Sequence, residues 1–246
     1  QASFIVWKIA DDELLLACAA SVHAATLKRL SMFVLRAQCK LSDASGELPL
    51  VGVVGASARH LMGDLPAWSH RAIGGGSLLR LPDVDGVARC IVASNQPLGA
   101  VAPALDATAW RMLEVRSGIP IIEAATVDQF VPQMLNYELV GGVDFGKGCY
   151  PGQEVVARSQ YRGTIKRRMF LFEASAPLEA GQEVFHSADP AQPAGMVVNA
   201  AGPLALVEVK LAALDGGGLH AGAADGPTLV RRELPYSVPS DAAQAA

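Results

Sequence analysis

The chain has 246 residues, of which 51% are hydrophobic and 18% charged, and its formal net charge at pH 7 is −4. This composition is typical of a globular protein and excludes a largely disordered one. The negative charge argues against a nucleic-acid-binding protein that depends on its overall charge, but not against a local basic patch. No apolar run approaches the roughly 18–20 residues that span a bilayer, and the first residues do not read as a signal peptide. We therefore expect a soluble, cytoplasmic protein without membrane contact.

Because the chain opens directly in strand-like sequence, we expect that an N-terminal portion is missing. Apolar strands are predicted at residues 3–9 and 13–18. A helix capped by Ser21 is predicted through residue 33, and the alternating residues 34–41 predict a third strand. These elements make a β-β-α-β unit.

A second unit of the same kind is predicted next. It has a strand at 50–54, a short helix at 56–62, and a hairpin of strands 77–81 and 87–93 across the turn signal Asp83-Val84-Asp85-Gly86. Three consecutive glycines precede the hairpin. They are interpreted as a turn, because no G-x-G-x-x-G pattern and no βαβ frame accompany them.

A further helix is predicted from Asp106 to Arg116, capped by Asp106 and ended by Gly118. Trp110 on this helix either packs in a core or flanks a ligand. The repeated combination of hairpin and helix predicts an α+β fold with antiparallel sheets faced by helices. Residues 119–145 show no clear period, and we expect loops that wrap the functional site.

The sequence changes character after Gly163, where short apolar runs alternate with glycine and proline. These runs predict a small β-barrel or sandwich. We therefore predict two domains: residues 1–163 as an α+β region with two β-β-α-β type subdomains, and residues 164–246 as a C-terminal β-barrel. The predicted strands are 166–173, 183–186, 195–198, 204–210 and 228–232.

The four cysteines are far apart and form no Cys-x-x-Cys pair, which predicts neither a zinc knuckle nor a disulfide framework. Cys18 and Cys39 are expected to pack in the core from strands, and Cys90 lies inside a predicted strand. The five histidines have no ligand spacing, so no metal site is predicted.

Most of the predicted chemistry lies in one stretch, Gly146-Lys147-Gly148-Cys149-Tyr150-Pro151-Gly152-Gln153-Glu154. A helix is predicted here with Pro151 in its first turn, which places Cys149 just before the helix N-terminus. Unpaired N–H groups at that end favour a thiolate over a thiol. Lys147 adds a charge beside the thiol, and Glu154 is spaced i,i+4 from Arg158.

The residues after this stretch are basic, with no acid between Glu154 and Glu173, so a locally cationic thiol is expected. The alternative is a small packing cysteine beside a solvated basic face. Gly141 and Gly146-Lys147 match the start of a P-loop, but Gly148 stands where Ser or Thr should bind Mg²⁺, so an NTPase is not expected. The basic residues are Arg158, Arg162, Lys166, Arg167 and Arg168.

The stretch from Gly141 to Arg158, continuing through Tyr161-Arg162-Gly163 to Lys166-Arg167-Arg168, closely resembles the signature of the YgfZ family. The core of that signature is K-G-C-[FY]-x-G-Q-E, and the resemblance covers nearly the whole chain. It implies a T-protein-like fold with ferredoxin-like antiparallel sheets and a small C-terminal barrel. It also implies a folate-binding protein implicated in iron–sulfur cluster assembly or repair and in tRNA modification.

The site that the resemblance and the residues together predict uses tetrahydrofolate as its cofactor. Backbone N–H groups of the glycines could hold an anion such as the glutamate tail of folate. The catalytic candidates are Cys149 and Lys147, and no metal ligand is predicted. The ligand-binding candidates are Gly146, Gly148, Tyr150, Gly152, Gln153, Glu154, Arg158, Arg162, Trp110 and Arg116.

One departure from the family concerns the pterin contact. T-proteins and many YgfZ-like chains end a helix in an L-R-x-E-A-G-like sequence whose Glu binds the pterin. Here the matching stretch is Leu113-Glu114-Val115-Arg116-Ser117-Gly118, so Arg116 takes the place of that Glu. An arginine cannot accept the N–H donors of a pterin.

Three functions stay open at this point. The first is a YgfZ-type factor that supports iron–sulfur enzymes, including those that thiolate tRNA, and it is not expected to be a conventional enzyme. Its expected partners are folate, iron–sulfur proteins or cluster assembly factors, and tRNA-modifying enzymes, and a monomer is expected. The second is a tetrahydrofolate-dependent aminomethyltransferase. The third is an RNA-binding module that uses Arg158 to Arg168, with Tyr161 and Phe170 as its aromatic residues.

Overall fold

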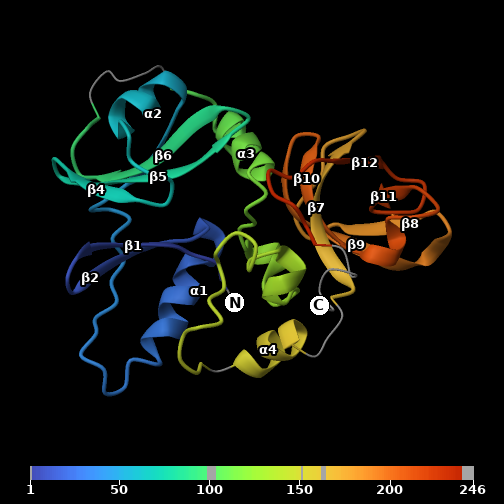
Figure 1. The fold of residues 1–246 in the computed structure, drawn as a ribbon, viewed down its shortest axis with the longest axis horizontal. Coiled ribbons are helices and arrows are strands. Elements are labelled where there is room, and N and C mark those ends of the chain that lie inside the picture. The colour runs from blue at the N-terminus through green and yellow to red at the C-terminus, as the bar shows by residue number, and fades with distance from the viewer. Residues whose placement is uncertain (1, 99–103, 151, 162–164, 240–246) are drawn as a thin grey trace. The chain divides into compact units, whose positions relative to one another are not determined.

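The computed structural model describes residues 2–98, 104–150, 152–161 and 165–239, without the side chains of residues 159–161. The chain forms two compact units, residues 1–110 and 111–246 (Figure 1). The predicted α+β class with antiparallel sheets and a small barrel is confirmed. The barrel lies inside the second unit, and the domain boundary after residue 163 stays a prediction.

The first unit opens with the predicted hairpin, β1 (Ile5–Ala10) and β2 (Glu13–Ala17), which pair antiparallel. Trp7 is 5% exposed and its indole N–H donates to Ser77 Oγ at 2.9 Å, so the inner face of the hairpin packs on the sheet of this unit. Helix α1 (Ala20–Ser31) follows as predicted. Its N-cap is Ala19 and no side chain caps it, so the prediction that Ser21 caps the helix is wrong.

The third strand predicted at residues 34–41 is also wrong, because these residues form no strand. Leu35 is 84% exposed, and Cys39 is exposed rather than packed in a core. A strand needs hydrogen bonds to a neighbour, and among the described residues β1 and β2 pair only with each other. Alternation of apolar residues alone therefore does not make a strand here.

A four-stranded antiparallel sheet makes up the rest of the first unit, in the order β3-β6-β5-β4. Asp85 and Gly86 turn the β5–β6 hairpin with φ of +50° and +75°, the left-handed pair that a tight hairpin turn requires. This confirms the predicted hairpin, although β4 was not predicted. The elements are β3 (Leu50–Val54), α2 (Gly55–Met62), β4 (His70–Ile73), β5 (Gly76–Val84) and β6 (Val87–Ser94).

Helix α3 (Ala107–Arg116) begins and ends as predicted. The N–H of Thr108 donates to Asp106 Oδ1 at 3.0 Å, and Gly118 ends the helix with φ of +67°. The chain then forms loops with two 3₁₀ turns, η1 (Ala124–Thr126) and η2 (Pro132–Leu135), before α4 (Gln153–Tyr161).

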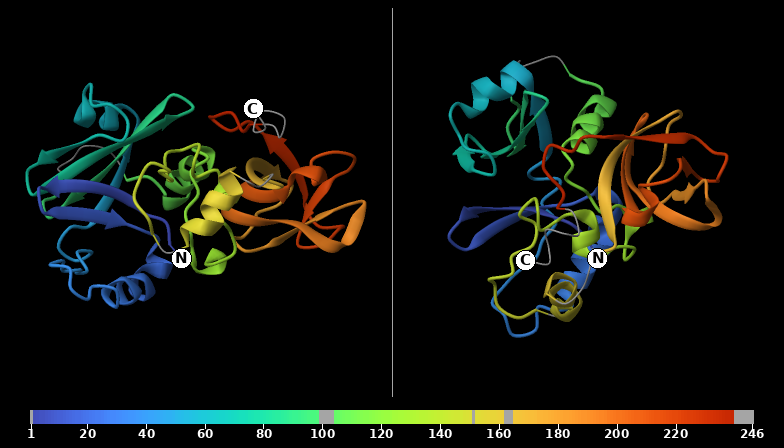
Figure 2. Two further views of the ribbon diagram at one scale, coloured as in Figure 1. Left: turned by 60° about the horizontal axis from the view of Figure 1, so that its bottom comes forward. Right: turned by 45° about the vertical axis from the view of Figure 1, so that its right-hand side comes forward.

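Six strands close into a barrel in the order β10-β7-β12-β11-β8-β9, which confirms the predicted β-barrel (Figure 2). Phe172, Val184 and Val207 are at most 2% exposed and fill its interior. Leu171 and Leu206 belong to a second core with Leu135 of η2. The strands are β7 (Arg167–Ala174), β8 (Glu183–His186), β9 (Asp189–Ala201), β10 (Leu204–Lys210), β11 (Leu219–Ala221) and β12 (Thr228–Arg232), with a 3₁₀ turn η3 (Leu211–Ala213).

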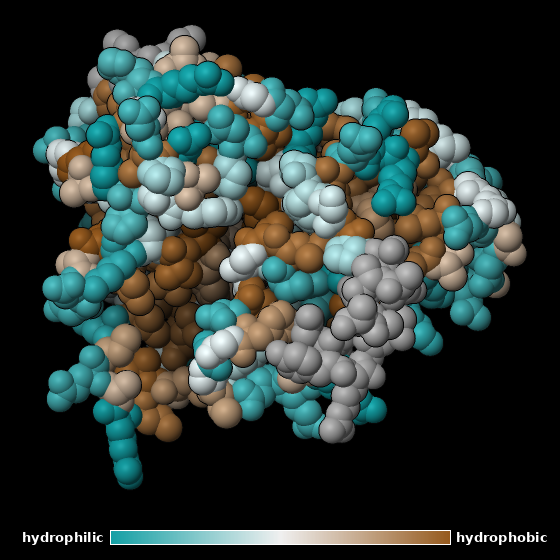
Figure 3. All heavy atoms as spheres, viewed as in Figure 1, coloured by the Kyte–Doolittle hydropathy of each residue, from teal (hydrophilic) through white to brown (hydrophobic). Residues whose placement is uncertain are grey.

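The surface carries apolar as well as polar regions. Val6, Leu14 and Leu16 on the outer face of the β1–β2 hairpin are 41–57% exposed. Figure 3 shows apolar surface in the left part of the view, where β1, β2 and α1 lie in Figure 1. None of the helices in the described ranges combines the length and the hydropathy that crossing a bilayer requires.

Candidate functional site

The signature loop, residues 144–150, leads into α4 and is shaped by local hydrogen bonds. Asp144 Oδ1 accepts the N–H of Gly146 at 2.7 Å. The N–H of Tyr150 donates to Gln153 Oε1 at 3.1 Å, and the N–H of Gln153 donates back to the carbonyl of Tyr150 at 3.2 Å. These bonds fix where the loop ends and the helix begins. Gly152, between them, has φ of +86°, which favours glycine.

Cys149 is exposed and lies four residues before Gln153, the first residue of α4. The helix thus begins later than predicted, and the action of its N-terminus on the thiol stays a prediction. Lys147 Nζ lies 4.1 Å from the centroid of the Tyr150 ring, a cation–π contact. The structure thus gives the Lys147 ammonium an aromatic partner, and its predicted action on the thiol stays a prediction. Pro151 and Arg162 lie outside the described residues.

The basic run after α4 is less cationic than the sequence predicted. The guanidinium of Arg167 binds both carboxylate oxygens of Glu208, with Nη2 2.8 Å from Oε2, and these bonds raise the pKa of Arg167. Arg168 is 1% exposed and forms an ion pair with Glu138. Two of the charges that the RNA-binding hypothesis counted are therefore paired. Lys166 is exposed.

The sequence did not predict these pairs, because the acids lie 30 and 41 positions from their arginines. Arg158 on α4 is exposed, as is Glu154. The cationic character of the site therefore depends on fewer residues than expected.

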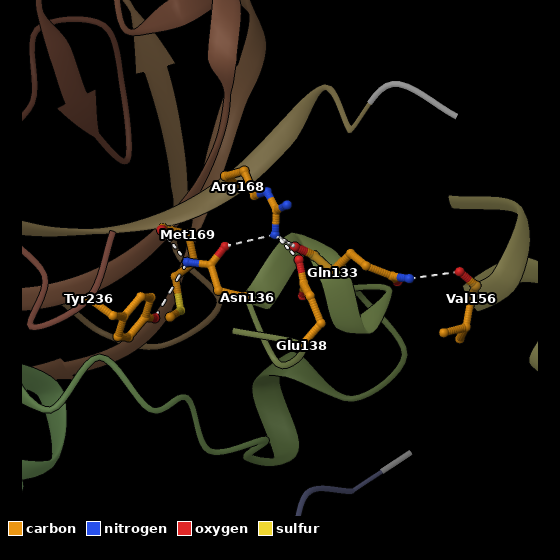
Figure 4. A network of polar contacts seen from close by, with 7 residues as sticks. All are labelled: Gln133, Asn136, Glu138, Val156, Arg168, Met169 and Tyr236. Atoms are coloured by element: carbon orange, nitrogen blue, oxygen red, sulfur yellow. Dashed lines mark hydrogen bonds and ion pairs between the residues drawn. The ribbon is translucent and has the colours of Figure 1, made fainter. Parts of the chain in front are cut away.

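A buried polar network, defined here as Gln133, Asn136, Glu138, Arg168 and Tyr236, lies between β7 and α4 (Figure 4). Arg168 Nη1 is its centre: it donates to the carbonyl of Gln133 at 3.0 Å, to Asn136 Oδ1 at 3.3 Å and to the Glu138 carboxylate. The network was not predicted, because three of its members fall in the region without a clear period.

The network continues from Asn136 toward the C-terminal residues. Asn136 Nδ2 donates to the carbonyl of Met169 at 2.8 Å and lies 3.4 Å from the hydroxyl of Tyr236. That hydroxyl donates to the carbonyl of Gly118 at 2.7 Å, and burial raises the pKa of Tyr236 to about 12. A Cβ at Gly118 would lie 2.8 Å from the Tyr236 ring, which leaves room there only for glycine. Tyr236 thus binds the C-terminal segment to the residue that ends α3, through a hydrogen bond and close packing.

The other end of the network reaches the helix of the signature. Gln133 is fully buried, and its Nε2 donates to the carbonyl of Val156 in α4 at 2.7 Å. Val156 is 8% exposed, whereas Val155 beside it is 54% exposed. Gln133 therefore joins α4 to the same arginine that is anchored in the barrel strand.

Trp110 and Arg116, the two predicted site residues that lie far from the loop in the sequence, differ in their exposure. Trp110 packs on the first unit, where a Cβ at Gly52 of β3 would lie 2.5 Å from the Trp110 ring. This favours the core interpretation of Trp110 over the ligand interpretation. Arg116 is exposed at the end of α3 in the second unit.

The described residues do not make a complete tetrahydrofolate site. Arg116 offers only donors where the family has an acceptor, and the N–H of Gly146 is already bonded to Asp144. Two hollows of the described chain lie elsewhere, one lined by Arg71 and Ser94 and the other by Arg167 and Glu208. Gly148 has open space around its Cα and stays available for an anion.

The remaining cysteines differ from Cys149. Cys90 is fully buried, and burial raises the pKa of its thiol to about 11. Burial also raises the pKa of Cys18. Within the described ranges, no three side chains of His, Cys, Asp and Glu come together as metal ligands. Cys149 is therefore the thiol with an exposed position and a helix N-terminus behind it.

No family model matches the chain, but curated proteins are similar to it. The tRNA-modifying protein YgfZ of Edwardsiella ictaluri is 35% identical over 174 residues, which are 62% of this chain and 50% of that protein. The chain is a homologue of YgfZ. The YgfZ proteins of Shigella boydii and Escherichia fergusonii are each 31% identical over 178 residues, 67% of this chain and 54% of theirs. The chain thus spans about half the length of the curated relatives that it matches.

A solved structure agrees with this homology at the level of the fold. The glycine cleavage system aminomethyltransferase T of Bartonella henselae has a TM-score of 0.66 to the chain and covers 94% of it, with 70% of that protein matched. The predicted T-protein-like fold of this YgfZ homologue is confirmed. The sequence identity is 14%, so the likeness concerns the fold alone.

Proposed function

We propose that this YgfZ homologue is a cytoplasmic factor that supports the assembly or repair of iron–sulfur clusters, including those of tRNA-modifying enzymes. Its partners are iron–sulfur proteins or their assembly factors. The observation that carries the proposal is the exposed Cys149 in the signature loop at the start of α4. The names of the curated relatives support the link to tRNA modification.

In this proposal Cys149 is the reactive group and the loop presents it. Its exposed thiol is accessible to a partner. Lys147 adds a positive charge two residues away. The local bonds from Asp144 and Gln153 hold the loop in one shape without enclosing the thiol.

Complementation tests this proposal in a bacterium that lacks its own YgfZ protein. The full-length protein is supplied as the wild type or as Cys149→Ala, and thiolated nucleosides in bulk tRNA are measured by mass spectrometry. We expect the wild type to restore them and Cys149→Ala to fail while accumulating to the same level. The matched control is Cys39→Ala, another exposed cysteine outside the signature. Full restoration by Cys149→Ala would remove the proposal.

Tetrahydrofolate is proposed as a weakly bound ligand, and no step of the function is derived through it. Arg116 repels the donor edge of a pterin, so the substitution Arg116→Glu restores the acceptor that relatives of this type carry at the matching position. Calorimetric titration of the full-length protein should give about tenfold higher affinity for Arg116→Glu, about 1.4 kcal/mol. An unchanged or lower affinity would contradict the proposal that this protein binds tetrahydrofolate through position 116.

A tetrahydrofolate-dependent aminomethyltransferase is the second candidate, favoured by the fold of the Bartonella henselae protein. It predicts that the full-length protein transfers a one-carbon unit to tetrahydrofolate in a turnover assay. This activity should survive Cys149→Ala, because T-protein chemistry does not depend on the cysteine of the signature. Turnover in the variant together with loss of complementation would assign the two properties to different sites.

A further inference from the structure

Helix α4 contains the last residues of the signature, and few of its described side chains are buried against the rest of the second unit. Among its described side chains, Val156 is the buried one, while Glu154, Val155 and Arg158 are exposed. The helix packs on η2, the 3₁₀ turn that contains Gln133. The bond from Gln133 Nε2 to the carbonyl of Val156, 2.7 Å long, is a buried polar link between α4 and the part of the unit behind it.

Gln133 is itself fixed from the barrel side. Its backbone carbonyl accepts from Arg168 Nη1 at 3.0 Å, and the same nitrogen binds Asn136 and Glu138 (Figure 4). Arg168 belongs to β7, which pairs with β10 and β12 inside the closed barrel. The barrel strand β7 thus holds the backbone of Gln133 through Arg168. The side-chain amide of the same residue then donates to α4.

Stability alone does not explain a glutamine at this position. Gln133 is fully buried, and its Oε1 accepts no hydrogen bond from any residue that the structure describes. Leaving a buried acceptor without a donor is unfavourable, whereas an apolar side chain of the same size would bury the same area without that cost. What an apolar side chain cannot supply is a directed bond to Val156.

We infer that Gln133 is a positioning residue for the signature loop: through Val156 it fixes α4, and with it Cys149, at a set position on the barrel. The inference rests on the proposed function, in which Cys149 is the reactive group. It adds that the reactivity of Cys149 depends on a side chain in a different segment, which does not touch a substrate.

The test uses Gln133→Met in the full-length protein, with Gln129→Met as the matched control. The Gln129 side chain is exposed and donates to the carbonyl of Val127, two residues before it. We expect Gln133→Met to raise the hydrogen-exchange rate of peptides from residues 153–161 at least threefold and to change the rate of Cys149 alkylation by iodoacetamide by a similar factor. Peptides from β7 and β10 should keep their exchange rates in both variants.

A second variant, Gln133→Glu, supplies a readout that a purely structural role would not give. Its carboxylate cannot donate to Val156, but the protonated acid can. Because position 133 is fully buried, the introduced carboxyl takes up a proton at a higher pH than an exposed glutamate. Exchange in residues 153–161 should therefore be fast near pH 8 and return toward the wild-type rate as the pH falls to 5 and below. Arg168 and Glu138, the charged groups at the backbone carbonyl of Gln133, are also present in the wild type, which serves as the reference at each pH.

Two outcomes would overturn the inference. One is unchanged exchange and alkylation in Gln133→Met, and the other is faster exchange throughout the barrel with no recovery of Gln133→Glu at low pH. Neither depends on the cellular function, because both are measured on the purified protein. Conversely, full complementation by Cys149→Ala would remove the proposed function and leave the link between Gln133 and α4 standing.

Discussion

The signature segment and the barrel follow one another in the sequence, yet different interactions stabilise them. In the barrel every strand pairs with two neighbours, and residues such as Val184, Val197 and Leu206 are fully buried. In the signature segment the loop is held by bonds between near neighbours, and Cys149 and Val155 are exposed. The molecule therefore keeps its stabilising contacts and its candidate chemistry in different places, with the buried polar network between them.

The largest expected effect concerns the arginine at the centre of that network. Arg168→Met leaves Glu138 buried without its partner, and breaking a buried ion pair in this way costs about 3–5 kcal/mol. The control is Arg232→Met, which breaks an ion pair with Glu173 whose side chains are 50% and 45% exposed. Such an exposed pair contributes about 0–1 kcal/mol. Urea denaturation followed by circular dichroism measures the free energy of unfolding of both variants. Equal losses would contradict the expected difference between the buried and the exposed ion pair.

A pair of glycines compares the two regions directly. A Cβ at Gly195 of β9 would lie 2.2 Å from the backbone oxygen of Glu208, whereas a Cβ at Gly148 in the signature loop meets nothing within 4 Å. We expect Gly195→Ala to destabilise the protein by about 2–3 kcal/mol, because backbone must shift inside a closed barrel. Gly148→Ala should lie within about 0.5 kcal/mol of the wild type. Similar unfolding midpoints for the two variants would show that the barrel is less tightly packed than its register indicates.

The sequence predicted the barrel and the β5–β6 hairpin because their signals are local. Alternating apolar residues and turn residues such as Asp85-Gly86 act within a few positions, and the structure confirms both elements. The strand predicted at residues 34–41 failed because alternation does not supply a neighbouring strand. β11 was missed because three residues are too few to show a period.

In the candidate site, too, the features with local sequence signals were predicted and those that depend on distant residues were missed. Cys149 and its loop were predicted because the signature is contiguous, whereas Gln133 was missed because its partner Val156 is 23 positions away. The charge of the site was overestimated for the same reason, since Glu138 and Glu208 reach Arg168 and Arg167 only through the fold. Sequence patterns report local geometry, and the support of the site comes from contacts between distant segments.

A moderate effect is expected at the end of the network farthest from α4. Tyr236→Phe removes the hydroxyl that donates to the carbonyl of Gly118, which should cost about 1 kcal/mol at neutral pH. The pKa of this hydroxyl is raised to about 12 in the folded state, mainly by burial, from 10 in the unfolded chain. Between these values the unfolded chain releases the proton while the folded protein keeps it.

The contribution of Tyr236 is therefore fully present below pH 10 and is lost as the pH rises toward 12. Urea denaturation at pH 8, 10 and 11 should show the wild type losing more stability than Tyr236→Phe over this interval. The difference between the two proteins isolates Tyr236 from the other groups that titrate there. Parallel loss in both would place the raised pKa in doubt.

The smallest effect on stability is expected at the thiol with the largest proposed role. Cys149 is exposed, so Cys149→Ala should change the free energy of unfolding by less than about 0.5 kcal/mol. Cys90 is fully buried with a pKa raised to about 11, so Cys90→Ala should cost more and the native Cys90 thiol should resist iodoacetamide at pH 8. Mass spectrometry of the alkylated native protein gives the order of labelling. If Cys90 reacts as fast as Cys149, the exposed loop gives its cysteine no advantage over a thiol buried in the sheet of the first unit, and the proposed function loses the reactive thiol on which it depends.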